Sequence, residues 1–224
     1  MLAVVTYCYD WNWDKAEEQF RRALDLGAGV GTHENYGWSL ATQGRFAEAH
    51  EQLRLAAEQD PLSVAPPFDE SFVYSFDRNV AGERKMLAEI AHIQPDFIGV
   101  RAMDAVLSVQ EKDCPSARRE ADWLGKTYTK LPVTQAILAY AAACEGNKGE
   151  TLRRVREMVA LWAPAYQVAL AYAMIHDQDD AIAELEKSAD AHEEQILYIK
   201  YDPFFDEIRG DPQYVALEKR VGVL

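Results

Sequence analysis

The sequence predicts an all-α fold built from repeated pairs of helices. Three observations support this prediction. An apolar pattern recurs every 30 to 34 residues, glycine and proline stand where the expected helices end or begin, and no segment alternates with the period of a β-strand between hairpin turns. The 224 residues are 49% hydrophobic and 27% charged, which is ordinary for a globular protein and sufficient for a packed core.

The second helix of each repeat carries three small or apolar residues at positions i, i+4 and i+7. The six trios are Ala16, Phe20 and Ala23; Ala49, Leu53 and Ala56; Glu83, Leu87 and Ile90; Ala117, Ala121 and Leu124; Thr151, Val155 and Met158; and Ala181, Leu185 and Ser188. Their first members are separated by 33, 34, 34, 34 and 30 residues. This spacing places each trio on one face of a helix, which is the face we expect to be buried.

The first helix of each repeat is marked by a mostly small residue twelve positions before the trio. These residues are Val4, Gly37, Ser71, Ala105, Ala139 and Ala169. Small residues let two helices approach closely, so we expect each unit to be a helix A, a short turn and a helix B. Gly44 and Gly146 stand where helix A must end, in the left-handed conformation that glycine tolerates. Pro132 and Pro164 stand at the start of a following helix A, where a missing N–H costs nothing.

The aromatic stretch Trp11–Trp13 falls in the turn of the first unit. Asp14 is expected to be the N-cap of the next helix, with Glu17 completing a capping box three residues later. Large aromatic side chains in such turns cover the ends of a helix pair. We therefore interpret the two tryptophans as packing residues in preference to a ligand contact.

A helix–turn–helix unit of 34 residues with glycine and alanine at these places resembles the tetratricopeptide repeat (TPR). YDWNWDKAEEQFRRAL (9–24), GRFAEA (44–49) with DPLS (60–63), and ILYIKYDPFFDEIRGDPQYVAL (196–217) look like one bacterial group of TPR regions. That group usually forms the C-terminal part of signalling proteins, after a winged-helix DNA-binding, serine/threonine kinase or nucleotide cyclase domain. The resemblance implies a right-handed α-solenoid of about five to six units. No motif of those output domains occurs here, so their activities do not carry over.

The expected organisation is one continuous domain with a C-terminal cap. The units cover approximately residues 1–29, 30–63, 64–97, 98–131, 132–161 and 162–195, and capping helices follow at 196–224. In the cap, Asp202–Pro203 and Asp211–Pro212 are the expected helix starts. The apolar residues expected to cover the last repeat, whose outer face would otherwise be exposed, are Phe204, Phe205, Ile208, Tyr214, Leu217 and Val221.

Charge and cysteine content exclude several classes of function. A net charge of −14 and a pI near 4.8 argue against direct binding of nucleic acid, because such binding needs a basic surface. No apolar run is long enough for membrane insertion. Cys8, Cys114 and Cys144 are odd in number and widely spaced, so we interpret them as buried thiols of a reducing compartment. The expected location is cytoplasmic, unless the membrane anchor of a parent protein places the region in the periplasm.

Catalytic and metal-binding patterns are sparse. Glu89 and His92 form one ExxH pair, where a di-iron site needs two pairs and two further carboxylates. The acidic stretch DQDD (177–180) lacks the spacing of a calcium loop, and Asp179 or Asp180 is expected to cap a helix. No nucleophile elbow, phosphate-binding loop or HExxH motif occurs. We expect no catalytic residue, no cofactor and no metal, and therefore no enzyme.

Recognition by surface shape is the remaining function. In stacked helix pairs, helix A lines the concave face, which is the usual binding surface. The residues at those positions are Glu34, Trp38, Phe68, Phe72, Ala102, Val106, Tyr140, Tyr166 and Leu170. Trp38, Phe72 and Tyr140 occupy equivalent places and could form an aromatic track for a peptide, a protein partner or a second copy. Two alternatives stay open: the aromatic residues pack between adjacent units, or they hold an apolar metabolite in a small-ligand sensor.

Overall fold

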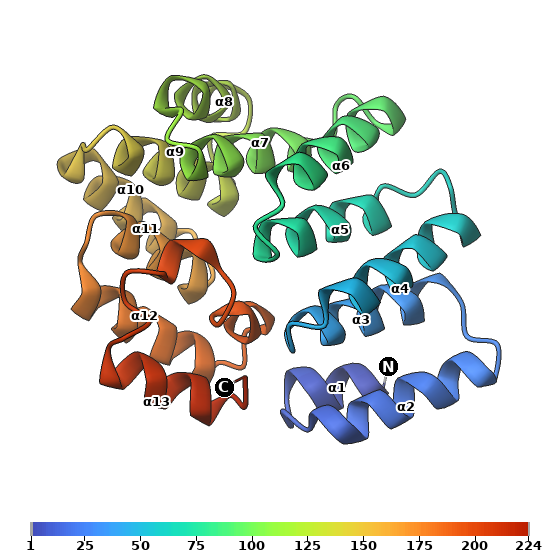
Figure 1. Cartoon of the computed structure of the whole chain (residues 1–224). Helices are drawn as coiled ribbons and strands as arrows, with labels where there is room; N and C mark the ends of the chain where they lie inside the picture. The colour runs from blue at the N-terminus through green and yellow to red at the C-terminus, as the bar shows by residue number, and fades with distance from the viewer. Residues whose placement is uncertain (1, 224) are drawn as a thin grey trace. The chain divides into compact units, whose positions relative to one another are not determined.

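The computed structural model describes residues 2–223, which form helices and connecting loops with no β-strand among them (Figure 1). The first twelve α-helices form six consecutive pairs. They are α1 (Leu2–Cys8) and α2 (Trp13–Asp25); α3 (Val30–Ala41) and α4 (Phe46–Gln59); α5 (Ala65–Phe76) and α6 (Val80–Ile93); α7 (Ile98–Gln110) and α8 (Cys114–Thr127); α9 (Pro132–Cys144) and α10 (Lys148–Ala160); and α11 (Ala165–Met174) and α12 (Gln178–Asp190). Two 3₁₀ helices, η1 (Glu194–Tyr198) and η2 (Pro203–Phe205), and α13 (Pro212–Arg220) follow. The predicted all-α repeat fold is confirmed.

The chain divides into two compact bodies. The N-terminal body comprises Met1–Asp96, with helices α1 to α6, and the later segments Leu197–Asp202 and Glu218–Leu224. The C-terminal body comprises Phe97–Ile196, with helices α7 to α12, and the segment Pro203–Leu217. The single continuous domain expected from the repeats stays a prediction.

The repeat pattern accounts for the core of each helix pair. Every trio residue except Ala23 is at most 3% exposed, including the charged Glu83 at a position where other repeats carry alanine or threonine. The small residues of helix A are buried opposite the trios, apart from the half-buried Val4. A Cβ atom on Gly37 would lie 3.0 Å from Leu53 Cγ and 3.3 Å from the carbonyl oxygen of Ala49. A side chain at this position would therefore force Leu53 and the α4 backbone to shift, and glycine allows this close contact between α3 and α4.

Each pair turns at one residue in the left-handed conformation. These residues are Trp11, Gly44, Arg78, Lys112, Gly146 and His176, with φ between 52° and 74°. They follow one another at the same 33, 34, 34, 34 and 30 steps as the trios. At Gly146, for example, the next N–H, that of Asn147, donates to the carbonyl oxygen of Ala142 at 2.9 Å and closes α9.

The residue after each left-handed position is the N-cap of helix B. Four of these N-caps carry a side chain that accepts the N–H three residues ahead, at 2.9 to 3.2 Å: Asn12, Asn79, Asp113 and Asn147. The expectation that Asp14 caps α2 is therefore wrong. The left-handed Trp11 ends the turn early enough for Asn12 to take that place, and Asp14 lies inside the first turn of the helix. Asp179 and Asp180 likewise lie inside the first turn of α12, behind the N-cap Asp177.

Lys112→Gly is expected to stabilise the C-terminal body by about 0.5–1 kcal/mol. Lys112 is exposed at φ 60°, where a side chain crowds its own backbone, and glycine removes that strain at some cost in unfolded-chain entropy. Gly146→Ala, at φ 72° with open space around the new Cβ, should lose a similar amount. Urea unfolding measures both; a destabilised Lys112→Gly variant would contradict this account of the turns.

The C-terminal segments partly follow the expected capping role. Asp211 accepts the N–H of Gln213 at 2.7 Å at the start of α13. In the C-terminal body, the Phe205 ring lies edge-on to Tyr166 of α11, 5.5 Å between centroids, and 6.0 Å from Tyr214. Val221, in contrast, belongs to the N-terminal body and not to the last repeat.

The aromatic turn of the first unit provides the surface that the chain end covers. A Cβ on Gly222 would lie 2.9 Å from Trp13 Nε1, so this end of the chain packs directly on the first turn. Trp13 also lies 6.3 Å from Tyr7 of α1 between ring centroids. Trp11 and Trp13 are both half-buried, and these contacts support their interpretation as packing residues.

The cysteines differ from the expectation of buried reduced thiols. Cys114, at the start of α8, and Cys144, at the end of α9, form a disulfide with a Cα–Cα distance of 5.5 Å. Both are half-buried, and Cys8 lies outside the bond. The two residues meet because each stands at the turn end of its helix pair, and neighbouring pairs bring these ends together.

Candidate functional site

An aromatic cluster on two A helices of the N-terminal body is the strongest candidate site. Trp38 of α3 lies 5.7 Å from Phe72 and 6.5 Å from Phe76 of α5, measured between ring centroids. Phe68, one turn before Phe72, meets it edge-on at 5.2 Å. Trp38, Phe68 and Phe72 are half-buried, whereas Phe76 is 7% exposed. The structure thus brings three of the predicted residues together, and we call them, with Phe76, the aromatic cluster.

The segment Leu197–Asp202 of the same chain lies against the aromatic cluster. The ring of Tyr198 stands 5.0 Å from Trp38 and 5.2 Å from Phe76 between centroids, tilted by 30° and 32°. Tyr198 is 9% exposed, and its neighbours Leu197 and Ile199 are fully buried. Offset, tilted aromatic pairs at this distance are favourable beyond the area they bury.

A second tyrosine of the segment anchors it at the neighbouring turn. Tyr201 meets Phe46 edge-on at 5.1 Å, and Lys200 Nζ lies 5.4 Å from the centre of the Tyr201 ring. A Cβ on Gly44 would lie 2.2 Å from the Tyr201 hydroxyl oxygen, so any other residue at this position would force the Tyr201 side chain to shift. The N–H of Tyr201 donates to the carbonyl oxygen of Tyr198 at 2.9 Å, which folds the segment into a helical turn. Both tyrosines thereby point to one side of the turn.

Glu34 provides a polar group on α3, one turn before Trp38. It is half-buried, and desolvation by burial, together with the nearby charge of Asp60, raises the pKa of its carboxyl group. A carboxylate in this setting favours a hydrogen-bond donor or a cation on a bound partner.

The predicted residues of the C-terminal body lie in a different environment. Tyr140 of α9 is 4% exposed, and its hydroxyl donates to the carbonyl oxygen of Gln167 in α11 at 2.9 Å. Tyr166 is 4% exposed and packs on Phe205. Val106 and Leu170 are partly buried and pack against the core of this body, and Ala102 is within that core. In this body, Tyr140 and Tyr166 pack between adjacent helices, as one of the two alternatives from the sequence expected. A role of these residues in partner binding stays a prediction.

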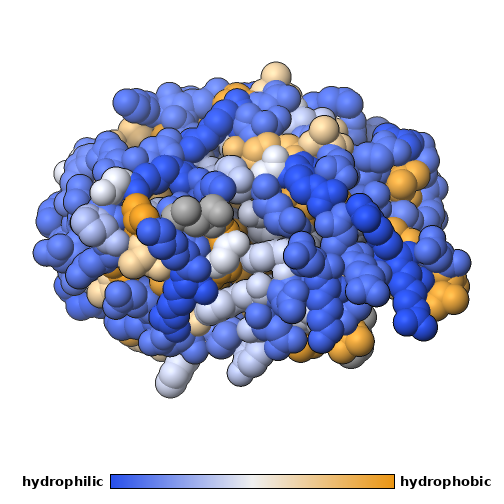
Figure 2. Space-filling view, turned by 60° about the horizontal axis from the view of Figure 1, so that its bottom comes forward, coloured by the Kyte–Doolittle hydropathy of each residue, from blue (hydrophilic) through white to orange (hydrophobic). Residues whose placement is uncertain are grey.

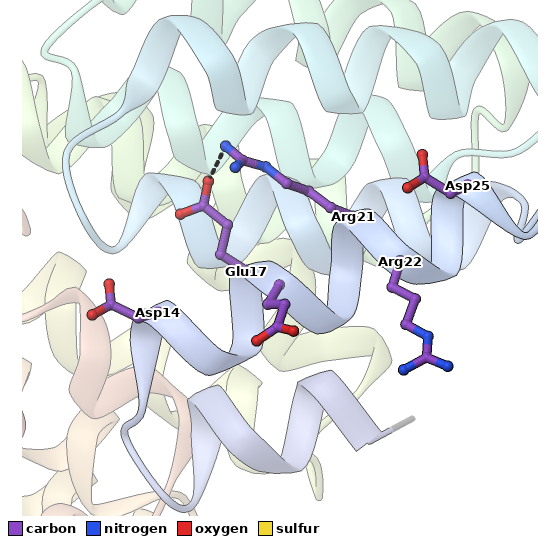
Figure 3. A pocket seen from close by; sticks show the side chains of 6 residues that line it. Asp14, Glu17, Arg21, Arg22 and Asp25 are labelled. Atoms are coloured by element: carbon purple, nitrogen blue, oxygen red, sulfur yellow. Dashed lines mark ion pairs between the residues drawn. The ribbon is translucent and has the colours of Figure 1, made fainter.

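A second surface feature is a charged depression of about 620 Å³ along α2 (Figure 3). All six lining residues come from this one helix: Asp14, Glu17, Glu18, Arg21, Arg22 and Asp25. Figure 3 shows Glu17 and Arg21 paired, while Asp14, Arg22 and Asp25 point apart. Arg45 also donates to Glu17 at 2.7 Å and holds the pKa of that carboxyl below its usual value. A single helix surface cannot enclose a ligand, so this depression is a solvated face.

A third feature is an apolar groove of about 910 Å³ between α1, α2 and the start of α3. Leu2 and Leu26, 69% and 79% exposed, are among its lining residues. Arg22 is the only residue with an ionisable side chain among those that line the groove. The groove therefore offers apolar contact area and no reactive group.

The Glu89 and His92 pair of α6 does not belong to a metal-binding cluster in the described part of the chain. No set of three or more histidine, cysteine or acidic side chains there could hold a metal ion. Glu89 and His92 are exposed on α6, and Glu89 Oε1 lies 3.7 Å from Lys85 Nζ.

Hydrophilic residues dominate the face in Figure 2, with apolar residues in separate patches. Among the described residues, no helix has the length and apolar character needed to cross a membrane.

Two residues of the aromatic region were not predicted. Phe76 follows Phe72 by four residues on α5, so helical periodicity alone could have placed it on the same face. Tyr198 stacks on a residue 160 positions earlier, and no local pattern signals that contact.

No protein-family model and no curated protein matches the chain. Among solved structures, it is similar to a tetratricopeptide repeat protein from Parabacteroides merdae, with 15% identity and a TM-score of 0.55 over 98% of this chain and 91% of that one. It is also similar to a chain of the APC/C hetero-tetramer Cut9–Hcn1, with 11% identity and a TM-score of 0.61. That match covers 97% of this chain and 48%, about half, of the other. The chain therefore has the TPR α-solenoid fold.

Proposed function

We propose that this TPR chain is a non-catalytic interaction module that binds a short segment of a protein partner on the aromatic cluster of α3 and α5. The observation that supports it is the contact of the Tyr198 ring with Trp38 and Phe76, in which the aromatic cluster already packs against an aromatic side chain of the same chain. Aromatic residues on a rigid helical scaffold are favoured hot spots for peptide recognition. In a larger signalling protein the module would act as a sensory or scaffolding part.

The alternatives have less support. A small-ligand sensor needs an enclosed pocket with converging polar groups, and neither the charged face of α2 nor the apolar groove beside α1 has that form. A second copy of the chain could supply the bound segment, and the oligomeric state in solution distinguishes that case. The cysteines no longer support a cytoplasmic location, because Cys114 and Cys144 form a disulfide and such bonds persist in oxidising compartments.

Selection of peptides from a random display library tests the proposal. Peptides that bind the wild type are expected to lose about 30-fold or more in affinity to the Trp38→Ala variant, since buried aromatic anchors contribute about 2 kcal/mol or more. Trp162→Ala, which removes a 92% exposed tryptophan from the turn that follows α10, is the matched control and should bind as the wild type. Equal affinity for wild type and a folded Trp38→Ala variant would refute the proposal.

A further inference from the structure

We propose that the segment Leu197–Asp202 is a tethered ligand that occupies the aromatic cluster, and that the external partner is a helical turn with two aromatic side chains at i and i+3. The inference rests on the proposed function and adds a partner class and a regulatory device. Tyr198 and Tyr201 supply the two side chains in the resident segment, and their spacing defines the motif Tyr-x-x-Tyr.

The two tyrosine side chains of the segment are held by specific contacts with the N-terminal body. Its two tyrosines make ring contacts with Trp38, Phe76 and Phe46, on three different helices of the N-terminal body. Gly44 leaves space for the Tyr201 hydroxyl, which would have to shift if residue 44 carried a Cβ atom. Both anchors therefore fit into places formed by α3, α4 and α5.

The segment is also distinct from its neighbours in the chain. Leu197–Asp202 belongs to the N-terminal body, whereas the residues on both sides, Phe97–Ile196 and Pro203–Leu217, belong to the C-terminal body. These six residues are therefore part of the N-terminal body, although the residues before and after them in the sequence are not. A partner with the same two aromatic groups must displace them. The apparent affinity of the partner is therefore its intrinsic affinity multiplied by the fraction of molecules in which the segment is undocked.

A direct binding measurement tests this competition. The probe is a fluorescent peptide of residues 194–202, EQILYIKYD, and the receptor is the full chain carrying Tyr198→Ala and Tyr201→Ala. The peptide is expected to bind this receptor at least about ten-fold more tightly than the wild type, because the surface is no longer occupied. A peptide with alanine at both tyrosine positions should not bind, and adding Trp38→Ala to the receptor should abolish binding.

A glycine pair provides a second route that leaves the segment unchanged. Gly44→Ala places a methyl group on Tyr201 and should release the segment, whereas Gly146→Ala, at nearly the same φ, meets no atom within 4 Å. Amide exchange of residues 197–202 is expected to rise about ten-fold or more in Gly44→Ala and to stay as in the wild type in Gly146→Ala. This comparison remains informative if the double tyrosine variant does not fold.

The outcomes separate the two proposals. If library peptides bind in a Trp38-dependent way but bind the wild type and the double tyrosine variant equally, the tethered-ligand inference is overturned and the proposed function stands. If no peptide depends on Trp38, both are overturned. Equal amide exchange of residues 197–202 in Gly44→Ala and Gly146→Ala also overturns the inference.

Discussion

Replacing both Cys114 and Cys144 by serine is expected to lower the free energy of unfolding of the C-terminal body by about 3–4 kcal/mol. The disulfide joins residues 30 positions apart, and closing a loop of that length restricts the unfolded chain by about this amount. The bond links α8 to α9 of the following pair. Arg118 reinforces the same junction through Glu145, at 2.5 Å, and Glu150, at 3.5 Å.

Thermal unfolding with and without a reducing agent measures this contribution. The wild type should lose on the order of 10 °C in Tm on reduction, and the double serine variant should already be at the lower value and respond no further. Cys8→Ser is the matched control, since Cys8 lies outside the disulfide, and it should retain the response to reduction. A wild type whose Tm is the same with and without reductant would contradict a structural role for this bond.

Tyr140→Ala is expected to destabilise the C-terminal body by about 3–5 kcal/mol. The ring is 4% exposed in the core between α9 and α11, and its removal leaves a cavity and ends the hydrogen bond to the carbonyl oxygen of Gln167. Tyr140→Phe keeps the ring and loses only that bond, so it should cost about 1 kcal/mol. Urea unfolding of the two variants separates ring packing from the hydroxyl contact.

The difference in stability between Tyr140→Ala and Tyr140→Phe matters for any binding test of the predicted aromatic track, which includes Tyr140. Loss of binding in Tyr140→Ala would report an unfolded body as readily as a lost contact, whereas Tyr140→Phe leaves the fold intact. A loss below about 1 kcal/mol in Tyr140→Ala would show that the ring is not part of the core and would return it to the predicted binding face.

The periodic part of the fold could be predicted from the sequence because each repeat uses the same local physics. The spacing of the trio residues matches the 3.6-residue period of an α-helix and so predicts the B helices. Gly44 and Gly146 mark two of the left-handed turns. The other turns are held by Trp11, Arg78, Lys112 and His176, whose types give no such signal. A recurring Asn or Asp immediately after these positions is the signal that could have corrected the N-cap at Asp14.

The candidate site was only partly accessible to sequence reasoning. Trp38 and Phe72 follow from their positions in the repeat, but that register alone does not separate surface from core. Tyr140 has the equivalent position in its repeat, but it lies in the core because α9 is buried along most of its length. The contact of Tyr198 with Trp38 depends on how the segment after the last repeat packs on the N-terminal body, and the repeat pattern does not specify that packing.

The indole resonances of the five tryptophans offer the most direct test of the central claim, that the aromatic cluster of α3 and α5 is the binding surface. The measurement is an NMR spectrum of the ¹⁵N-labelled chain carrying Tyr198→Ala and Tyr201→Ala, recorded while the peptide EQILYIKYD is added. The account predicts that the Trp38 indole signal moves in a saturable way while those of Trp123 and Trp162 stay in place. A Trp38 signal that stays fixed while Trp162 shifts would contradict it.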